Sequence, residues 1–324
     1  MGPNTSPPVL ELSTLAVVLQ APETLDVRRL ELTPPSAEDV VVDVEWSGIS
    51  TGTERLLWSG KMPPFPGLGY PLVPGYESVG RVISTGAQSG RRIGERVFVP
   101  GARCYGEVKG LFGGAAARVV VPGHRTIPLA DDLEERGVLL ALAATARHAI
   151  AAAGARAPDL VIGHGVLGRL LARLTIAAGH PAPVVWETNP ARHAGALGYA
   201  VTTPAEDTRR DYHAIYDVSG DSSLLDTLIG RLAPGGEVVL AGFYSEPLHF
   251  SFPPAFMREA RIRVAAEWRP DDLAVVQSQA ASGLLSLDGL ITHRELATCA
   301  PAAYRTAFTD PACLKMILDW RACS

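Results

Sequence analysis

The stretch 163–168, Gly-His-Gly-Val-Leu-Gly, has the residue types and the spacing of a turn that binds phosphate. The apolar run 160–162 before it is typical of a buried strand, and an apolar segment at helical spacing follows it. Gly163 would allow a tight turn, Gly165 would let the backbone approach a pyrophosphate, and Gly168 would let helix and strand pack together. The N-terminus of the helix would bind the phosphate charge. The pattern predicts a dinucleotide site, with an ordinary strand-to-helix turn as the alternative.

A carboxylate follows at the distance that suits a ribose contact. The β-rich run 184–186 ends in Glu187, about 20 residues past the last glycine. An acid at this point hydrogen-bonds the ribose hydroxyls and would repel the 2′-phosphate of NADP, so it favours NAD. Arg192 lies close enough along the chain to keep NADP open. The cofactor-binding residues predicted from this stretch are Gly163, Gly165, Val166, Leu167, Gly168 and Glu187.

Length and composition limit the class of protein. The 324 residues are too many for one core and suit two domains, and 47% hydrophobic with 19% charged residues is typical of a globular protein. A net charge of −5 without a basic run argues against nucleic acid as a partner. The apolar region 138–154 contains Arg147 and His148, so it predicts a core helix and no integral membrane segment.

Features near the chain ends and the cysteines bear on location. Residues 1–8 are expected to be a disordered leader, and the N-terminal segment lacks the basic start and apolar block of a signal peptide. The 4 cysteines stand apart without a CxxC pair, which is typical of reduced thiols in a cytoplasm. We therefore expect a cytoplasmic protein.

The chain divides into a β-rich first part and an alternating second part. Short strands separated by turn residues fill 15–99, and 134–153 is predicted to be one connecting helix. From residue 160 strands and helices alternate, which predicts an α/β fold with a doubly wound parallel sheet.

Five motifs occur in an order that resembles the medium-chain dehydrogenase/reductase superfamily. They are GIS-TGTE at 48–54, PGYExxG at 74–80, the glycine turn at 163–168, PGG-strand-G at 234–242, and ITH at 291–293 with KMIL at 315–318. The resemblance implies a β-rich, partly barrel-like (GroES-like) catalytic domain from residues 1–147 with 285–324. It also implies a Rossmann NAD-binding domain over 148–284, with the substrate in the cleft between the domains. Members of the superfamily are often dimers or tetramers, so a homo-oligomer is possible.

Longer segments in both domains are similar to one branch of that superfamily, the dehydrogenases of bacteriochlorophyll biosynthesis. They include ISTGTERLLWSGKMPPFPGLGYPLVPGYESVG, VIGHGVLGRLLARLT, AFMREARIRVAAEWRP and DPACLKMILDW. The resemblance implies NAD-dependent oxidation of the 3-(1-hydroxyethyl) group of a bacteriochlorophyllide to 3-acetyl, in bacteriochlorophyll a biosynthesis. The partner would be a chlorin-type pigment, and the protein would be cytoplasmic or peripheral at the photosynthetic membrane.

The chain departs from the zinc-dependent members of the superfamily at the three positions that hold their catalytic metal. The first position falls on Ser50 or Thr51, the second on Tyr76, and the third near Ala141. These side chains do not supply the converging N, S or O ligands that zinc requires, so no catalytic metal is predicted.

Without zinc, another group must take the proton of the alcohol. Tyr76 occupies the position that the resemblance places toward the nicotinamide, and a phenol with a lowered pKa would serve as a general base. Thr51, Ser50 or Thr53 would relay the proton. The alternative is that Tyr76 only fills the volume left by the metal. Glu77 is expected to organise its loop through hydrogen bonds.

Further cofactor contacts are predicted at the sheet edge and on the connecting helix. Thr145 matches the family's threonine beside the nicotinamide. Gly242 and Phe243 end a strand at the edge where ligands bind in such sheets, and their backbone would contact the carboxamide. His164 would either border the pyrophosphate or be a solvated turn residue.

The proline- and glycine-rich loop 58–74 and its surroundings carry aromatic residues suited to a flat macrocycle. The predicted substrate-binding residues are Trp58, Phe65, Tyr70 and Phe112. The alternative is a small satellite core beneath the loop.

Three functions remain open at this stage. The first is an NAD-dependent secondary-alcohol dehydrogenase that acts on the pigment. The second is a zinc-free quinone or enoyl NAD(P)H reductase on the same scaffold. The third is a non-catalytic NAD-binding regulator.

Overall fold

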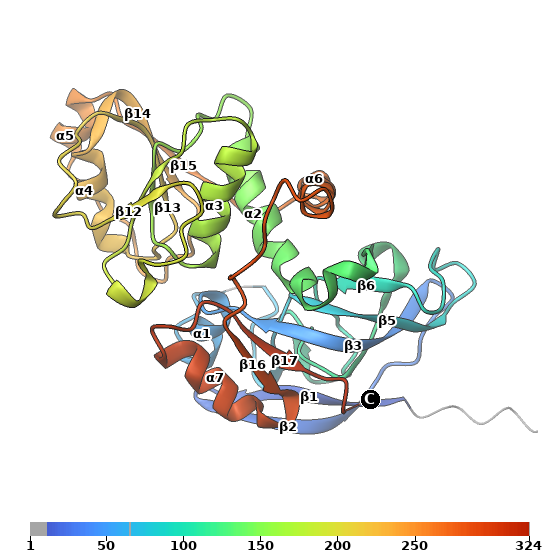
Figure 1. The fold of residues 1–324 in the computed structure, drawn as a ribbon. Coiled ribbons are helices and arrows are strands. Elements are labelled where there is room, and N and C mark those ends of the chain that lie inside the picture. Colours follow the sequence, from blue (N-terminus) through green and yellow to red (C-terminus); the bar gives the residue numbers. More distant parts are fainter. Residues whose placement is uncertain (1–11, 65, 324) are drawn as a thin grey trace, which may run out of the picture.

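The computed structural model describes residues 12–64 and 66–323, so the predicted leader at 1–8 and the predicted substrate residue Phe65 lie outside the described part. Two lobes are built around separate sheets and joined through helices α2 and α6 (Figure 1). The helices are α1 (Thr53–Trp58), α2 (Leu140–Ala151), α3 (Val166–Ala177), α4 (Leu225–Ile229), α5 (Phe252–Met257), α6 (Pro270–Ala281) and α7 (Ala300–Thr309).

The first lobe combines the start and the end of the chain. Its strands form a 4-stranded sheet, β2-β1-β4-β7, and a 7-stranded sheet, β16-β17-β3-β5-β6-β9, with β8 paired to β3. The strands are β1 (Ser13–Ala21), β2 (Thr24–Glu31), β3 (Asp39–Ile49), β4 (Leu72–Val73), β5 (Ser78–Thr85), β6 (Arg96–Val99), β7 (Lys109–Gly110), β8 (Arg118–Pro122), β9 (Ile127–Pro128), β16 (His293–Leu296) and β17 (Met316–Asp319).

Strand β17, from the end of the chain, lies between β16 and β3 in the 7-stranded sheet. It pairs antiparallel with β3, with Met316 opposite Ile49, and in Figure 1 the red C-terminal strands lie beside the blue N-terminal ones. This pairing supports the assignment of residues 285–324 to the catalytic domain. The exact domain bounds stay a prediction.

The second lobe is a 6-stranded parallel sheet in the order β12-β11-β10-β13-β14-β15. Strand order reverses next to β10, as in a doubly wound fold, so the predicted α/β class is confirmed. The strands are β10 (Leu160–Ile162), β11 (Val184–Trp186), β12 (Ala200–Thr202), β13 (Tyr212–Asp217), β14 (Leu232–Leu240) and β15 (Arg261–Val264).

The single helix predicted over 134–153 is wrong in its first part. Residues 131–139 form 3₁₀ turns in which Glu134 has φ +43°, and the α-helix begins only at Leu140. The non-helical conformation of Glu134 interrupts the segment, and at Gly137 the backbone lies so close to the first lobe that a Cβ would be 2.8 Å from side-chain atoms of both Leu129 and Val79. The chain therefore passes tightly over the first lobe before α2 crosses to the second.

One hydrophobic core cluster extends across both lobes. Buried Val79 and Phe98 of the first lobe share it with Val161 and Leu170 of the second, and Tyr76 packs at its margin. Among residues 12–64 and 66–323, no helix is long and apolar enough to span a membrane.

Candidate active site

The glycine turn has the geometry that its sequence predicts. Gly163 has φ +101°, a conformation that side chains disfavour, and a Cβ on Gly168 would lie 1.9 Å from the Gly163 carbonyl oxygen. A Cβ on Gly165 would meet no described atom within 4 Å. Gly165 is also the N-cap of α3, so the free N–H groups of the first helical turn begin at Val166. The turn fits a pyrophosphate.

Glu187 bends back toward this turn from the end of β11. Its Oε2 accepts a hydrogen bond from the backbone N–H of His164 at 3.0 Å, and Oε1 accepts one from that of Asn189 at 2.8 Å. The carboxylate therefore lies beside the glycine turn with a fixed orientation. Each oxygen retains a lone pair for a ribose hydroxyl.

His164 is not the solvated turn residue that one interpretation expected. Its side chain is buried, with Nδ1 2.6 Å from the carbonyl oxygen of Arg192 and Nε2 2.8 Å from the hydroxyl of Tyr199. Burial lowers its pKa to about 4, so the ring is neutral at physiological pH. The guanidinium of Arg169 bonds the carbonyls of His164, Arg192 and Ala194. The turn is thus fixed by buried polar contacts.

Arg192, the residue that left NADP as an alternative cofactor, is directed at the other lobe. Its Nε donates to the carbonyl oxygen of Pro311 at 2.9 Å, in the loop before β17. This contact holds the guanidinium in a lobe-to-lobe hydrogen bond.

Two hydroxyl groups that bond each other lie at the positions where zinc-dependent members of the superfamily hold their metal. The hydroxyl of Tyr76 donates to Oγ of Ser50 at 2.8 Å, and the Thr53 hydroxyl also contacts the phenol. Ser50 is buried at the end of β3, and Thr51 beside it is partly exposed. Tyr76 packs against the same core cluster as Leu167 and Val218, which flank the glycine turn. Of the predicted proton-handling residues, Tyr76, Ser50 and Thr53 are therefore brought together, beside the core cluster that both lobes share.

The lowered pKa expected for Tyr76 is wrong. Burial raises the pKa of this phenol, and the neighbouring charge of Glu77 raises it further, although the hydroxyls of Ser50 and Thr53 oppose the shift. Tyr76 is therefore a neutral hydroxyl at physiological pH. It suits a relay through hydroxyl groups better than a resting phenolate base.

The residues at the metal positions do not fit zinc. Ser50 and Tyr76 bond each other, and Ala141 is a buried residue in the first turn of α2. Within the described part of the chain, no three His, Cys, Asp or Glu side chains are grouped so as to hold a metal ion. Neutral hydroxyls and a methyl group are not the ligand set that zinc uses.

Two buried carboxylates lie under the hydroxyl pair. Glu77 is fully buried, and its Oε2 pairs with Nζ of Lys315 at 2.6 Å, so its side chain ties the loop to the strand β17 region; that Glu77 organises its own loop stays a prediction. A Cβ on Gly48 would lie 2.2 Å from that oxygen, so the glycine makes room for the carboxylate. Glu54 is buried as well and accepts from the hydroxyl of Tyr304 at 2.6 Å.

Sequence reasoning missed the roles of Glu54, Lys315 and Tyr304. Glu54 belongs to the TGTE motif and Lys315 to the KMIL motif. Their spacing along the chain does not show that both side chains bond the peptide group between Ile49 and Ser50. The contact partners are separated by 250 residues for Tyr304 and Glu54, and by 238 for Lys315 and Glu77.

The other predicted cofactor residues lie after strand β14 and on helix α2. Gly242 follows β14, donates from its backbone N–H to the Asp217 carbonyl at 3.0 Å, and packs on Val218. Phe243 is 45% exposed, which leaves its ring accessible beside that edge. Thr145 lies on α2 and bonds the carbonyl of Ala141 at 2.9 Å. Their contacts with a cofactor stay predictions.

The loop aromatics contribute to a satellite core. Trp58 and Tyr70 pack against a small cluster that contains Leu57 and Leu72, and the Tyr70 hydroxyl bonds the carbonyl of Leu57. Phe112 packs there too and also meets Tyr76 edge-on, with ring centroids 5.4 Å apart. All three rings stay partly exposed. Phe112 is the one that connects this core with the hydroxyl pair.

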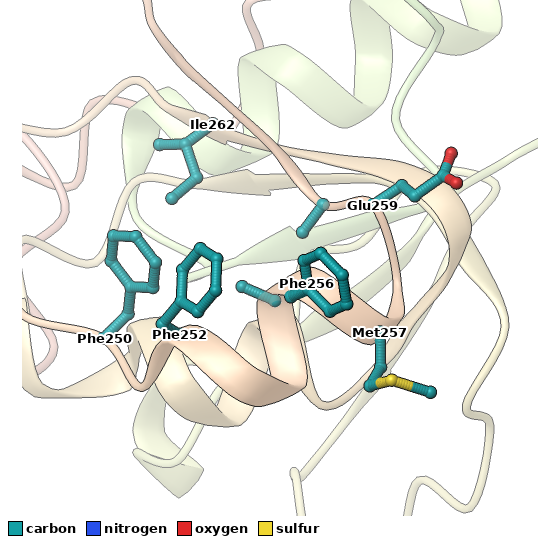
Figure 2. Close-up of a pocket in the computed structure, with 8 residues that line it drawn as sticks. Phe250, Phe252, Phe256, Met257, Glu259 and Ile262 are labelled. Carbon is teal, nitrogen blue, oxygen red and sulfur yellow. The ribbon is translucent and has the colours of Figure 1, made fainter.

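A separate apolar hollow of about 500 Å³ lies at the far edge of the second lobe (Figure 2). Phe250, Phe252, Phe256 and Ile262 line it, from α5, β15 and the chain before them. In the sheet, β13 and β14 separate β15 from the glycine-turn strand β10. The hollow is therefore distinct from the dinucleotide site.

Comparison with solved structures shows the same two-lobed fold. The chain aligns with 2R,3R-butanediol dehydrogenase from Bacillus subtilis at a TM-score of 0.82 and 21% identity, covering 95% of this chain and 99% of that one. An alcohol dehydrogenase from Escherichia coli CFT073, solved with NADH, aligns at a TM-score of 0.80 and 22% identity, covering 95% and 99%.

Sequence comparison is more specific. Residues 36–131 match the model of the alcohol dehydrogenase GroES-like domain. The chain is 56% identical over 316 residues to 2-desacetyl-2-hydroxyethyl bacteriochlorophyllide A dehydrogenase of Cereibacter sphaeroides, covering 96% of this chain and 99% of that protein. It is 57% identical over 311 residues to the same enzyme of Rhodobacter capsulatus, covering 96% and 99%. The resemblance inferred from the motifs is confirmed, and the chain belongs to the family of 2-desacetyl-2-hydroxyethyl bacteriochlorophyllide A dehydrogenases within the medium-chain dehydrogenase/reductase superfamily.

Proposed function

We propose that the chain oxidises the 3-(1-hydroxyethyl) group of a bacteriochlorophyllide to 3-acetyl, with NAD as the hydride acceptor. The observation that carries the proposal is the 56–57% identity to two bacteriochlorophyllide dehydrogenases over 96% of the chain. That span includes both the glycine turn and the hydroxyl pair. The geometry of both sites is compatible with the reaction.

The second lobe supplies the cofactor site. The N-terminus of α3 and the glycine turn would hold the pyrophosphate, and Glu187 would hold the adenosine ribose. Thr145 and the backbone at Gly242 and Phe243 would border the nicotinamide. When bound, the cofactor accepts the hydride from the carbinol carbon.

The first lobe supplies the proton path. The carbinol oxygen would bond to the Tyr76–Ser50 hydroxyl pair, and its proton would pass along these hydroxyls, with Thr51 or Thr53 leading toward solvent. Oxidation breaks the C–H and O–H bonds of the carbinol and forms a C=O bond conjugated with the macrocycle. That conjugation stabilises the developing carbonyl where zinc would otherwise polarise the oxygen.

The substrate would lie against the partly exposed rings of Trp58, Tyr70 and Phe112. Aromatic faces and apolar area suit a flat macrocycle. Phe112 is the best supported of the three, because it touches the catalytic phenol.

Incubation of the purified protein with NAD and the hydroxyethyl pigment tests the proposed function. We expect a shift of the visible pigment band together with NADH formation in equal amounts. No band shift, combined with NADPH-dependent reduction of quinones, would favour the reductase. Nucleotide binding without turnover of either substrate would favour the regulator.

The choice of NAD over NADP rests on Glu187, with Arg192 engaged at Pro311. Glu187→Gln should weaken NAD binding on the order of 10-fold, since a hydrogen bond to a charged group is worth about 1.5–3 kcal/mol. Binding of NADP should weaken less, because the repelling charge is gone. Titration by nucleotide fluorescence measures both dissociation constants. Glu107→Gln, at an exposed carboxylate of the first lobe, is the control. If Glu187→Gln weakens the binding of NAD and NADP equally, the assignment of Glu187 to the ribose is contradicted.

We also propose that two copies associate through the hollow shown in Figure 2. Phe252, Phe256 and Met257 are 67%, 64% and 75% exposed, and β15 is the last strand of its sheet in the described part of the chain. An exposed apolar patch beside an unpaired strand edge is typical of an interface. Phe256→Glu should shift a dimer to monomer in sedimentation velocity, while Ile93→Glu, at an equally exposed site in the first lobe, should not. A monomeric unmodified protein would contradict this proposal.

A further inference from the structure

Glu54 is a fully buried carboxylate with one donor on each oxygen. It lies in α1, directly after the residues that would relay the proton. Its Oε1 accepts from the backbone N–H of Ser50 at 3.0 Å, and its Oε2 accepts from the hydroxyl of Tyr304 at 2.6 Å. Tyr304 comes from α7, near the end of the chain, and is itself buried. The Glu54 side chain therefore bonds the backbone of Ser50, the residue whose hydroxyl bonds Tyr76.

The backbone that Glu54 contacts is held from its other side by a cation. Nζ of Lys315 donates to the carbonyl oxygen of Ile49 at 3.2 Å and pairs with Glu77 at 2.6 Å. The Ile49 carbonyl and the Ser50 N–H belong to the same peptide group. That peptide lies between an ammonium at its oxygen and a carboxyl group at its nitrogen, so both ends of its dipole are fixed.

The orientation of this peptide group determines the orientation of the Ser50–Tyr76 hydroxyl pair. The Cα of Ser50 follows the peptide directly, and its Oγ accepts the hydrogen bond from the Tyr76 hydroxyl at 2.8 Å. The direction in which the Ser50 hydroxyl is offered to a substrate therefore depends on the peptide that Glu54 and Lys315 hold.

The pKa of Glu54 lies near neutral pH, because opposing effects act on its carboxyl group. Burial raises its pKa to about 7, and the nearby charge of Glu77 raises it too, whereas the donors Tyr304 and Ser50 and the charge of Lys315 lower it. Tyr76 also faces this group, as a neutral phenol. Glu54 is therefore largely protonated below about pH 7 and ionised above it.

Protonation would change the contacts that the carboxylate makes. An ionised carboxylate only accepts, which suits both donors. A neutral carboxyl carries its own proton on one oxygen, so the Tyr304 hydrogen bond must be lost or reversed. The Ser50 N–H then donates to a neutral carboxyl oxygen, which is a weaker acceptor than the carboxylate. The peptide is held firmly only in the ionised state.

We propose that Glu54 is a positioning residue whose ionised carboxylate holds the Ser50–Tyr76 hydroxyl pair in the arrangement that alcohol oxidation requires, which makes the activity pH-dependent. The inference rests on the proposed function of that hydroxyl pair. Activity should rise with pH, because the ionised form is the competent one. When Glu54 is neutral, the hydroxyl pair should be held about as poorly as in a Glu54→Gln variant.

The pH profile of kcat/KM for the hydroxyethyl pigment tests the proposal. The unmodified protein should show a rising limb near pH 7. Glu54→Gln should have a low kcat/KM without that limb. Tyr304→Phe should keep the limb but move it to higher pH, because it removes a donor that favours the ionised form. Tyr105→Phe is the matched control, since it removes another buried tyrosine hydroxyl that bonds Gly113 instead, and its limb should stay in place.

Two results would overturn the proposal. One is a limb of unchanged position and amplitude in Glu54→Gln, and the other is an unmoved limb in Tyr304→Phe. Difference infrared spectra recorded without substrate follow the carboxyl C=O band directly. A band that disappears near pH 7 in the unmodified protein and is missing in Glu54→Gln establishes the titration even if the pigment is not the substrate. Failure of the proposed function is thus distinguished from failure of this inference.

Discussion

Replacing Tyr76 with Phe is expected to lower kcat/KM for the pigment by about 10²–10⁴-fold, the usual contribution of a positioned proton-transfer group. The change removes only the hydroxyl that bonds Ser50 at 2.8 Å and leaves the ring against Phe112. Packing should therefore persist, and NAD affinity should change little. Because burial raises the pKa of Tyr76, its ionisation does not set the pH dependence in the neutral range.

Steady-state kinetics with the pigment, together with thermal unfolding, measure this effect. Tyr105→Phe again provides the control, because Tyr105 is a buried tyrosine of the first lobe whose hydroxyl bonds the backbone carbonyl of Gly113. An unchanged kcat in a normally folded Tyr76→Phe variant would remove the phenol from the proton path and leave it as a volume filler.

Replacing Lys315 with Met is expected to lower the free energy of unfolding by about 3–5 kcal/mol at neutral pH, the range for breaking a buried ion pair. Lys315 is 1% exposed and Glu77 is 0% exposed, so solvent cannot replace the lost partner. In addition, Oε1 of Glu77 has no hydrogen-bond partner among the described residues, which makes the carboxylate more dependent on Lys315.

Urea unfolding followed by tryptophan fluorescence measures this loss. The deficit should shrink as the pH falls, because burial already raises the pKa of Glu77 and a protonated Glu77 needs no cation. The double variant Lys315→Met with Glu77→Gln should recover part of the stability. Lys61→Met, at an exposed lysine, should change it by no more than about 0.5 kcal/mol. A small, pH-independent effect of Lys315→Met would show that the ion pair contributes little.

The dinucleotide lobe was the part that local sequence could predict. The glycine turn depends on residues within six positions of each other, and the positive φ of Gly163 and the close packing of Gly168 follow from the absence of a side chain. Parallel strand order likewise follows from alternating strands and helices.

The environment of the hydroxyl pair could not be predicted in this way. Glu54 contacts Tyr304 across 250 residues, and pairing of β17 with β3 is what brings Lys315 to Ile49. The pKa of Tyr76 does not follow from residue type alone, because it depends on burial and on the neighbouring charge of Glu77. Burial of His164 was also missed, because its partners Arg192 and Tyr199 come from later in the chain.

The proposed function requires the hydroxyl pair of Tyr76 and Ser50 to take the proton of the alcohol without a metal, while NAD takes the hydride. The most direct test is turnover of the hydroxyethyl pigment with NAD by protein exhaustively dialysed against a chelator, with zinc measured in the same sample. We predict unchanged kcat and no stoichiometric zinc, because Ser50, Tyr76 and Ala141 occupy the ligand positions. Loss of activity on chelation, with recovery when zinc is added back, would contradict the account.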